Sequence, residues 1–318
     1  MTDTQNTTAP ASLVPEIRPE VWADLEQRYR KLEDTVRHYN PSANFQQIRA
    51  AFEFAAKAHG AQMRKDGSPF ITHPLAVAQI VAEELHLDSE SIEAALLHDT
   101  IEDTSATHED ISRLFSPTVA DLVEGVSKLT RVHYTSKEEE QMENLRKMLM
   151  AMSKDIRVIL IKISDRLHNM RTGDAWPEQK RRDKARETME VYAPIANRLG
   201  ILNVKEELED RSLHYLDPVG YEEISKMLSE RAGEEFLARV SSVIELRLKE
   251  SGIEGATIKR RVKSIYGIYR KTIMQNKSFD EIYDIYAVRV ILDTLAECYS
   301  TLGLIHDMYH PLPNRFKD

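Results

Sequence analysis

The ten residues ALLHDTIEDT, residues 95–104, place His98 and Asp99 side by side at the end of an apolar run. If this stretch is one helix, Glu102 and Asp103 follow one turn later, so the four polar side chains share one broad face. Imidazole and carboxylate groups are the ligand types that suit Mn²⁺, Fe²⁺ or Zn²⁺. The stretch therefore predicts either part of a metal site or a solvated helix face.

Two ligands do not complete a metal site, and the neighbouring segments offer further candidates. His73 begins HPLAVAQIVAEELHL, which predicts a helix with Pro74 near its first turn. Asp165 lies in IRVILIKISDRLHNMRT, where the β-branched beginning favours a strand and the end favours a helix. Each candidate follows or opens an apolar segment, and this shared setting favours the metal site over the solvated face.

The rest of the chain is also predicted to be mainly helical. The segment NFQQIRAAFEFAAKAHGAQMR has helical apolar spacing and should end at the Gly67 and Pro69 breakers, and Asp88 or Ser89 is a candidate N-cap for the next-but-one helix. Residues 178–250 predict further helices with a break at LDPVG. Strand-like alternation occurs only after residue 255, in TIKRRVKSIYGIY and IYDIYAVRVIL.

Length and composition limit the classes of protein that fit. A chain of 318 residues predicts two domains, and a formal net charge of -9 argues against a nucleic-acid footprint spread over the whole protein. Cys298 is the single cysteine, so no internal disulfide is possible, and we expect this thiol to be buried in a core. The sequence contains neither a secretory signal nor a long apolar span, which predicts a cytoplasmic protein.

The order of His73, then His98 and Asp99, then Asp165 resembles the HD-domain metal-dependent phosphohydrolases. The surrounding segments RKDGSPFITHP, AALLHDTIEDT and NLRKMLMAMSKDIRVILIKISDRLHNMRT resemble one branch of them, the long Rel/Spo (RelA/SpoT) family of alarmone synthetase-hydrolases. The Thr/Asn/Ala/Pro-rich composition predicts a disordered tail over residues 1–16, and the patterns predict a helical domain over 17–196, a helical connector over 197–240 and the beginning of an α/β domain over 241–318. The resemblance implies that the helical domain is an HD hydrolase domain and that the α/β domain is the first part of a nucleotidyltransferase-like synthetase domain.

The resemblance also implies an activity, which is the Mn²⁺-dependent hydrolysis of the 3′-pyrophosphate of (p)ppGpp to GDP or GTP and pyrophosphate. Glu102 and Asp103 would position or activate the attacking water. The implied Mn²⁺ ligands are His73, His98, Asp99 and Asp165, and the implied nucleotide-binding residues are Arg64, which packs on the guanine, Lys65 near the phosphates, and Asn169 and Thr172 beside the nucleoside.

A basic segment, KRRVKSIYGIYRK (259–271), forms a second candidate site. On a strand, Lys259, Arg261 and Lys263 would share one face, which suits a polyphosphate, single-stranded RNA or plain solvent. By resemblance to the family's synthetase motif, Arg261, Lys263 and Lys271 would hold ATP phosphates and Asp284 would hold Mg²⁺.

The chain ends at PNRFKD, and the R-F-K-D motif carried by Arg315, Phe316, Lys317 and Asp318 is associated in the family with bifunctional members. We expect the synthetase acceptor segment and its catalytic glutamate to be absent, and ribosome and tRNA contacts to require further C-terminal domains. The partners expected for this chain are ppGpp, pppGpp, GDP and GTP, and no membrane. The two alternatives are a non-catalytic guanine-nucleotide sensor and RNA binding by residues 259–271. The stretch over 133–141 is close in sequence to the site and is a candidate gate for it.

Overall fold

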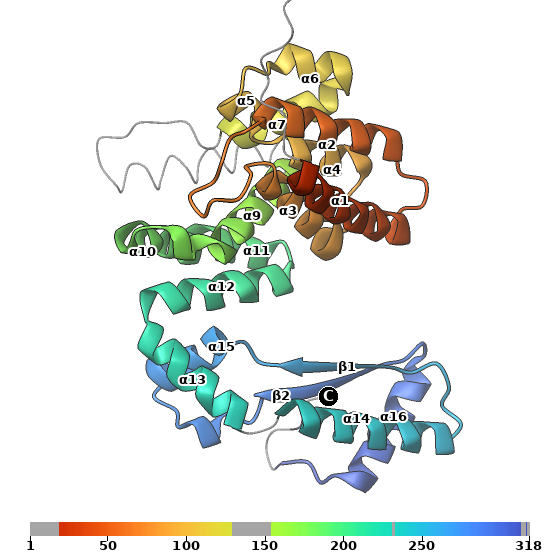
Figure 1. Ribbon diagram of the computed structural model, residues 1–318. Helices are drawn as coiled ribbons and strands as arrows, with labels where there is room; N and C mark the ends of the chain where they lie inside the picture. The colour runs from red at the N-terminus through yellow and green to blue at the C-terminus, as the bar shows by residue number, and fades with distance from the viewer. Residues whose placement is uncertain (1–18, 129–153, 231–232, 313–315, 317–318) are drawn as a thin grey trace, which may run out of the picture. The chain divides into compact units, whose positions relative to one another are not determined.

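The computed structural model describes residues 19–128, 154–230, 233–312 and Phe316. The described part is mainly helical with a small two-stranded sheet, which confirms the predicted fold class. The chain divides into two compact units, the N-terminal unit up to Ser212 and the C-terminal unit from Leu213 onward (Figure 1). The predicted tail over 1–16, the 133–141 stretch and three residues of the R-F-K-D motif, namely Arg315, Lys317 and Asp318, lie outside the described residues.

Helices alone make up the regular structure described in the N-terminal unit, apart from one short bridge between Met63 and Pro69. The α-helices are α1 (Pro19–Tyr39), α2 (Phe45–His59), α3 (Thr72–Ile80), α4 (Ser89–Leu97), α5 (Thr100–Asp103), α6 (His108–Leu114), α7 (Pro117–Lys128), α9 (Ile156–Arg171), α10 (Glu178–Glu187), α11 (Ala193–Arg198) and α12 (Leu202–Leu216), whose last turn crosses into the C-terminal unit. Short 3₁₀ and π turns join several of them: η1 (Val81–Leu85), η2 (Gly173–Ala175) and η3 (Thr188–Tyr192).

Helix α4 lies at the centre of the hydrophobic core of this unit. It packs against α2, α3, α7 and α9, and every residue from Ser91 to Leu97 is buried. A helix that is apolar all round can be stable only when it is covered on all sides, which explains the run EAALL. Each fully buried leucine or isoleucine contributes about 1.5–3 kcal/mol relative to an exposed one. The candidate site residues His98 and Asp99 follow directly after this helix.

The structure settles the local predictions on helix ends. Asp88 caps α4, because its carboxylate accepts a hydrogen bond from the Ser91 amide at 2.9 Å. The prediction that the helix beginning near Phe45 continues to the Gly67 and Pro69 breakers was wrong, because α2 ends at His59 and is capped by Gly60, which adopts a φ of 52°. The ambiguous segment around Asp165 is helical throughout as α9, because burial of its β-branched residues against the core outweighs their strand propensity.

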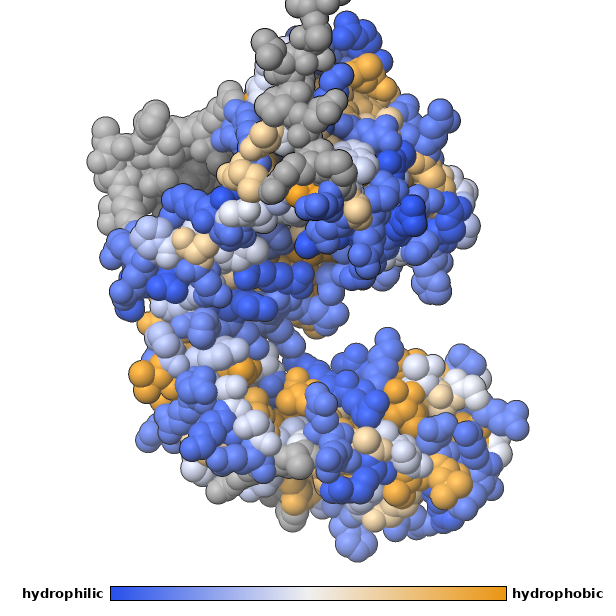
Figure 2. All heavy atoms as spheres, viewed as in Figure 1, coloured by the Kyte–Doolittle hydropathy of each residue, from blue (hydrophilic) through white to orange (hydrophobic). Residues whose placement is uncertain are grey.

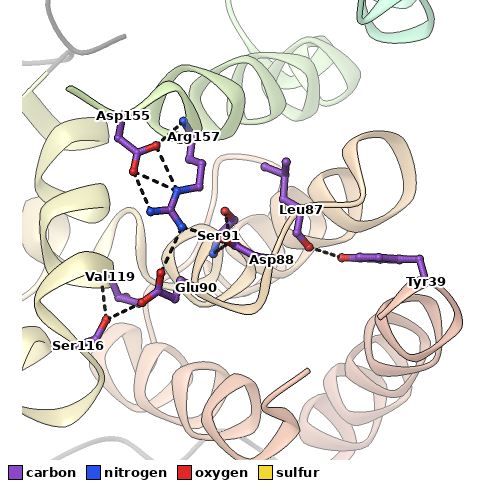
Figure 3. A network of polar contacts seen from close by, with 9 residues as sticks. All are labelled: Tyr39, Leu87, Asp88, Glu90, Ser91, Ser116, Val119, Asp155 and Arg157. Atoms are coloured by element: carbon purple, nitrogen blue, oxygen red, sulfur yellow. Dashed lines mark hydrogen bonds and ion pairs between the residues drawn. The ribbon is translucent and has the colours of Figure 1, made fainter. Parts of the chain in front are cut away.

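An arginine connects the first turns of α4 and α9 (Figure 3). Arg157 contacts Asp155 at 2.8 Å, Asp88 at 2.8 Å and Glu90 at 3.2 Å. Glu90 in turn accepts a hydrogen bond from Ser116 at the start of α7. This network fixes the beginnings of three helices relative to one another, and so helps to fix the position of residues further along α4 and α9.

The C-terminal unit contains the sheet. Strands β1 (Thr257–Val262) and β2 (Tyr286–Ile291) pair antiparallel, with Lys259 opposite Arg289 and Arg261 opposite Ala287. Helices α14 (Gly233–Glu250) and α16 (Leu295–Met308) pack together, and α14 contacts both strands (Figure 1). The remaining elements are α13 (Pro218–Glu230), α15 (Ile265–Tyr269), η4 (Arg270–Met274) and η5 (Phe279–Glu281).

Two predictions for this unit were wrong. The segment SIYGIY is not a continuation of the strand but helix α15, which begins at an N-cap where the Ser264 side chain accepts from the Gly267 amide. Cys298 is exposed on α16 rather than buried. Figure 2 shows hydrophobic residues at several places on the visible face of this unit. No helix in the described part of the chain is long and apolar enough to cross a membrane.

Candidate metal centre and substrate pocket

The His-Asp pair lies between two helices and not within one, which corrects the predicted single helix. Helix α4 ends at Leu97, His98 is its C-cap, and Asp99 is the N-cap of α5. At this junction, side chains bond to backbone carbonyls that a continuous helix would use for its own hydrogen bonds. The His98 Nδ1 lies 2.8 Å from the Ala95 carbonyl, and the Thr100 hydroxyl donates to the Leu97 carbonyl at 2.6 Å. His98 and Asp99 both keep right-handed helical backbone angles, so the chain passes from α4 to α5 without backbone strain.

Four side chains from three helical segments meet at this junction. His73 on α3 has its Nε2 atom 3.2 Å from Asp165 of α9 and 3.5 Å from Asp99. The His98 Nε2 lies 3.1 Å from the other oxygen of Asp99. His73, His98 and Asp99 each offer one ligand atom, and these three atoms all lie within 4.8 Å of one another. Both the residue types and this spacing are typical of a divalent metal site.

The atoms that face one another in this cluster fit a bound cation. The contact of His98 Nδ1 with the Ala95 carbonyl assigns the proton to Nδ1, so Nε2 carries a lone pair. This Nε2 atom is buried and has no hydrogen-bond partner among the described residues, yet it faces an oxygen of Asp99. Two lone pairs in contact repel each other, and a cation between them turns this repulsion into attraction.

A second histidine supports the first ligand from behind. The Nδ1 atoms of His73 and His168 lie 2.7 Å apart, and the two rings are 4.8 Å apart at their centroids. Burial lowers the pKa of both, and the neighbouring His73 and Arg64 help to lower that of His168 to about 3. The lowered pKa values favour the neutral form of both rings, and the 2.7 Å contact then joins a protonated Nδ1 of one ring to the lone pair on the Nδ1 of the other.

Asp165 is held in its charged form inside the protein. Burial acts to raise its pKa, but Lys162, at 2.8 Å, and His73 outweigh it and hold the pKa well below the usual value. Asn169, one turn further along α9, donates a hydrogen bond to the same carboxylate. A buried carboxylate that stays ionised is suited to bind a cation.

Glu102 and Asp103 belong to the short helix α5 and line the cavity beside the cluster. Burial raises the pKa of Asp103, and the charge of Asp99 raises it further. The Gln62 side-chain Nε2 donates to the Asp103 backbone carbonyl at 2.9 Å, and the Gln62 Oε1 lies 2.9 Å from the His59 Nδ1. These contacts fix α5 against the end of α2. A carboxylate whose pKa is raised toward neutrality is suited to take up a proton.

Arg64 and Lys65 lie in a tight loop that follows α2. The loop closes through hydrogen bonds from the Arg64 amide to the Ser68 carbonyl and from the Gly67 amide to the Arg64 carbonyl, and Gly67 adopts a φ of 81°. The Arg64 guanidinium donates to the Thr172 hydroxyl at 3.0 Å. This bond connects the loop to the end of α9, where Thr172 also donates to the His168 carbonyl.

A single cavity of about 430 Å³ joins these groups, a size typical of sites for small molecules. Nine of the ten residues predicted for the hydrolase site line it, and the tenth, His98, contacts the lining residue Asp99. The sequence did not suggest several further lining residues, which are Lys162 and Arg166 of α9, Trp176, and Lys180 and Lys184 of α10. Lys162 and Arg166 flank Asp165 on its own helix, whereas the approach of α10 requires the tertiary fold.

Three of the four residues predicted for the synthetase site lie close together in the C-terminal unit. Lys263 lies 3.0 Å and Lys271 lies 2.6 Å from the carboxylate of Asp284. Burial opposes the effect, but these two lysines lower the pKa of Asp284 to about 2. Arg261 lies on β1 and is exposed. The prediction that the basic residues share one strand holds for Lys259 and Arg261, while Lys263 follows the strand and Lys271 lies in η4.

Comparison with known proteins identifies two family regions in the chain. The family described as HD domain matches residues 51–202, and the family described as a region found in RelA / SpoT proteins matches residues 260–318. The bifunctional (p)ppGpp synthase/hydrolase SpoT of Escherichia coli is 46% identical over 292 residues, which are 91% of this chain and 41% of that protein. A Synechocystis protein named as a probable guanosine-3′,5′-bis(diphosphate) 3′-pyrophosphohydrolase is 48% identical over 270 residues, or 84% of this chain and 35% of that protein.

The chain thus spans about two fifths or less of the length of these curated relatives. Among solved structures, a metazoan ortholog of SpoT, described as hydrolysing ppGpp, is 26% identical, with a TM-score of 0.41, over 55% of this chain and 96% of that one.

Proposed function

Since the chain belongs to the Rel/Spo (RelA/SpoT) family, we propose that its N-terminal unit hydrolyses the 3′-pyrophosphate of (p)ppGpp, using a divalent cation held by His73, His98, Asp99 and Asp165. The observation that carries this proposal is the buried cluster of two imidazoles and two carboxylates beside a cavity with cationic walls. A site that holds a cation at one end and binds polyanions at the other is suited to hydrolyse a phosphate anhydride or ester.

The net reaction adds one water to the alarmone. The water oxygen forms a bond to the phosphorus next to the ribose, and the bond from this phosphorus to the 3′ oxygen breaks. Pyrophosphate leaves, and the 3′ oxygen of GDP or GTP takes up a proton. The chain's own residues must therefore accept one proton from water and direct another to the ribose oxygen.

Glu102 and Asp103 are the residues that we assign to this proton transfer. Both line the cavity beside Asp99, and the raised pKa of Asp103 brings it closer to neutrality than an ordinary aspartate. A bound divalent ion would supply Lewis acidity, which makes water a stronger acid and polarises a phosphoryl oxygen. Manganese is our proposal for the metal, because a mixed set of imidazole and carboxylate ligands suits it.

The remaining cavity residues are proposed to hold the nucleotide. Arg64 presents a planar guanidinium for stacking on guanine, and its hydrogen bond to Thr172 fixes the orientation of that plane. Asn169 lies beside the metal ligand Asp165 and can reach the nucleoside. Lys65 adds positive charge for the phosphates at the rim.

In the C-terminal unit, Arg261, Lys263, Lys271 and Asp284 are proposed as part of an ATP and Mg²⁺ site. The two lysines that now pair with Asp284 would turn to the phosphates when Mg²⁺ takes their place on the carboxylate. Synthesis of (p)ppGpp, contacts with ribosome and tRNA, and location in the cytoplasm remain predictions.

Product analysis tests the proposed hydrolysis. The chain is incubated with ppGpp and Mn²⁺, and the nucleotide and phosphate products are separated and quantified. We expect equal amounts of GDP and pyrophosphate, and none from an Asp99→Asn variant. Release of two equivalents of orthophosphate would contradict the assigned bond cleavage, while binding of ppGpp without any release would support the sensing function instead.

A further inference from the structure

Three lysines gather at one side of the substrate cavity. Lys65 comes from the loop after α2, while Lys180 and Lys184 lie one turn apart on α10. We call these residues the lysine cluster. They are distinct from Lys162, which also lines the cavity but forms an ion pair with the carboxylate Asp165 at 2.8 Å.

The surroundings of Lys180 indicate that the positive charge of the lysine cluster is only partly compensated. Burial lowers the pKa of Lys180, and the charges of Lys65 and Lys184 lower it further, whereas no carboxylate contributes to the shift. Its ammonium group lies 5.1 Å from the centre of the Trp176 ring. The side chain is therefore directed by an aromatic surface and by two other cations, and not by an acid.

Acidic partners balance only a part of this charge. Lys184 contacts Glu187 at 2.8 Å, but Glu187 also pairs with the buried Arg166 at 2.9 Å, so one carboxylate serves two cations. In the part of the chain that the structure describes, neither Lys65 nor Lys180 has a carboxylate within ion-pair distance. Mutual repulsion of three ammonium groups around one cavity is relieved when an anion binds between them.

The proposed substrate carries two diphosphates, and the cavity has two groups of basic side chains for them, which adjoin at Glu187. The diphosphate that is cleaved must lie at the metal cluster, near Lys162 and Arg166. We propose that the lysine cluster of Lys65, Lys180 and Lys184 is a separate subsite that binds the 5′-diphosphate of the nucleotide, which is not cleaved. This inference rests on the proposed function and assigns to α10 a role in substrate recognition.

The subsite has a consequence for specificity. GDP retains the 5′-diphosphate after hydrolysis, so it should bind to the lysine cluster as the substrate does. Guanosine 3′-diphosphate, which has no 5′ phosphate, should make no use of it. The affinity that the lysines contribute should also fall as salt rises, because the cluster lies at the open side of the cavity and two of its members are exposed.

Binding measurements with these three nucleotides test the inference. The dissociation constants of ppGpp, GDP and guanosine 3′-diphosphate are measured calorimetrically for the full chain in chelator, for the wild type and for Lys180→Gln with Lys184→Gln. The glutamines keep the aliphatic stems and remove two charges. We expect the double variant to bind ppGpp and GDP about ten- to a hundredfold more weakly, with guanosine 3′-diphosphate changed less than twofold.

Arg186→Ala is the matched control, because Arg186 lies on the same helix, pairs with Asp183 at 3.6 Å, and does not line the cavity. It removes a positive charge from α10 and should leave all three constants unchanged. An equal loss for all three nucleotides in the double variant, or no loss for GDP, would overturn the subsite. Because the binding assay needs no metal and no turnover, failure of hydrolysis would leave this test intact.

Discussion

Replacing His168 tests how the metal site is organised. When a cation binds to the Nε2 atom of His73, that ring must carry its proton on Nδ1, 2.7 Å from the Nδ1 of His168. His168 is then the hydrogen-bond acceptor that fixes the ring. His168→Phe keeps a ring of similar size but removes the acceptor, so the Nδ1 proton of His73 is left without a partner.

The size of the effect follows from burial. The His73 side chain is only 5% exposed, so water cannot replace the lost acceptor. A buried donor without a partner costs about 1–3 kcal/mol, and about 1.4 kcal/mol corresponds to a tenfold change in affinity. We therefore expect His168→Phe to weaken Mn²⁺ binding roughly ten- to a hundredfold, the range typical of residues that support a metal ligand.

The assay is a titration of chelator-treated protein with Mn²⁺, in which free Mn²⁺ is followed by electron paramagnetic resonance. His168→Asn is the matched control, because its side-chain oxygen can stand close to the position of the imidazole Nδ1 and accept the same bond. It should recover most of the affinity. Unchanged affinity in His168→Phe, or equal weakening in both variants, would refute the role of this hydrogen bond.

Three other predictions concern activity and stability. Asp99→Ala should abolish pyrophosphate release and weaken Mn²⁺ binding in the same titration; full activity would contradict the metal assignment. Burial and the charges of Glu90 and Asp88 raise the pKa of Glu93 from 4.5 to about 7. The contribution of protonated Glu93 to the free energy of unfolding is therefore fully present below pH 4.5 and is lost as the pH rises through 7. Glu93→Gln should thus be more stable than wild type at pH 8, by up to roughly 3 kcal/mol, and similar at pH 4.5, as urea unfolding would show; an equal difference at both values would refute the burial argument. Arg157→Ala should lower the free energy of unfolding by about 1–2 kcal/mol, because one half-buried side chain joins three carboxylates; no change would show that the network is only peripheral.

The polar residues of the metal cluster could be predicted from the sequence because each interrupts or opens an apolar segment. His98, for example, follows a helix that is buried on all sides, and burying a polar side chain in such a setting is unfavourable unless it has a partner. Asp165 has the same character on α9. Short-range pattern and residue type were sufficient to single out these positions as candidates, and their role as metal ligands stays a prediction.

Features that depend on tertiary contacts could not be predicted. The break between α4 and α5 arises from side-chain hydrogen bonds of His98 and Thr100 that compete with the helical ladder. The partnership of His73 and His168 joins residues 95 positions apart, and the approach of Lys180 depends on how α10 folds back over the cavity. The helix at SIYGIY was missed because its tyrosines and isoleucines favour strands, while the Ser264 cap and the packing of Ile268 against Ile224 in one small core favour a helix.

Pyrophosphate release from ppGpp, followed in one sample through removal and return of the metal, tests the central claim most directly. The chain is first treated with chelator, then given ppGpp, and then given Mn²⁺ in excess of the chelator. We predict no release before Mn²⁺ is added and stoichiometric formation of GDP and pyrophosphate afterward. Release at the same rate in chelator, or no release after Mn²⁺ by protein that binds both metal and nucleotide, would contradict metal-dependent hydrolysis at this cluster.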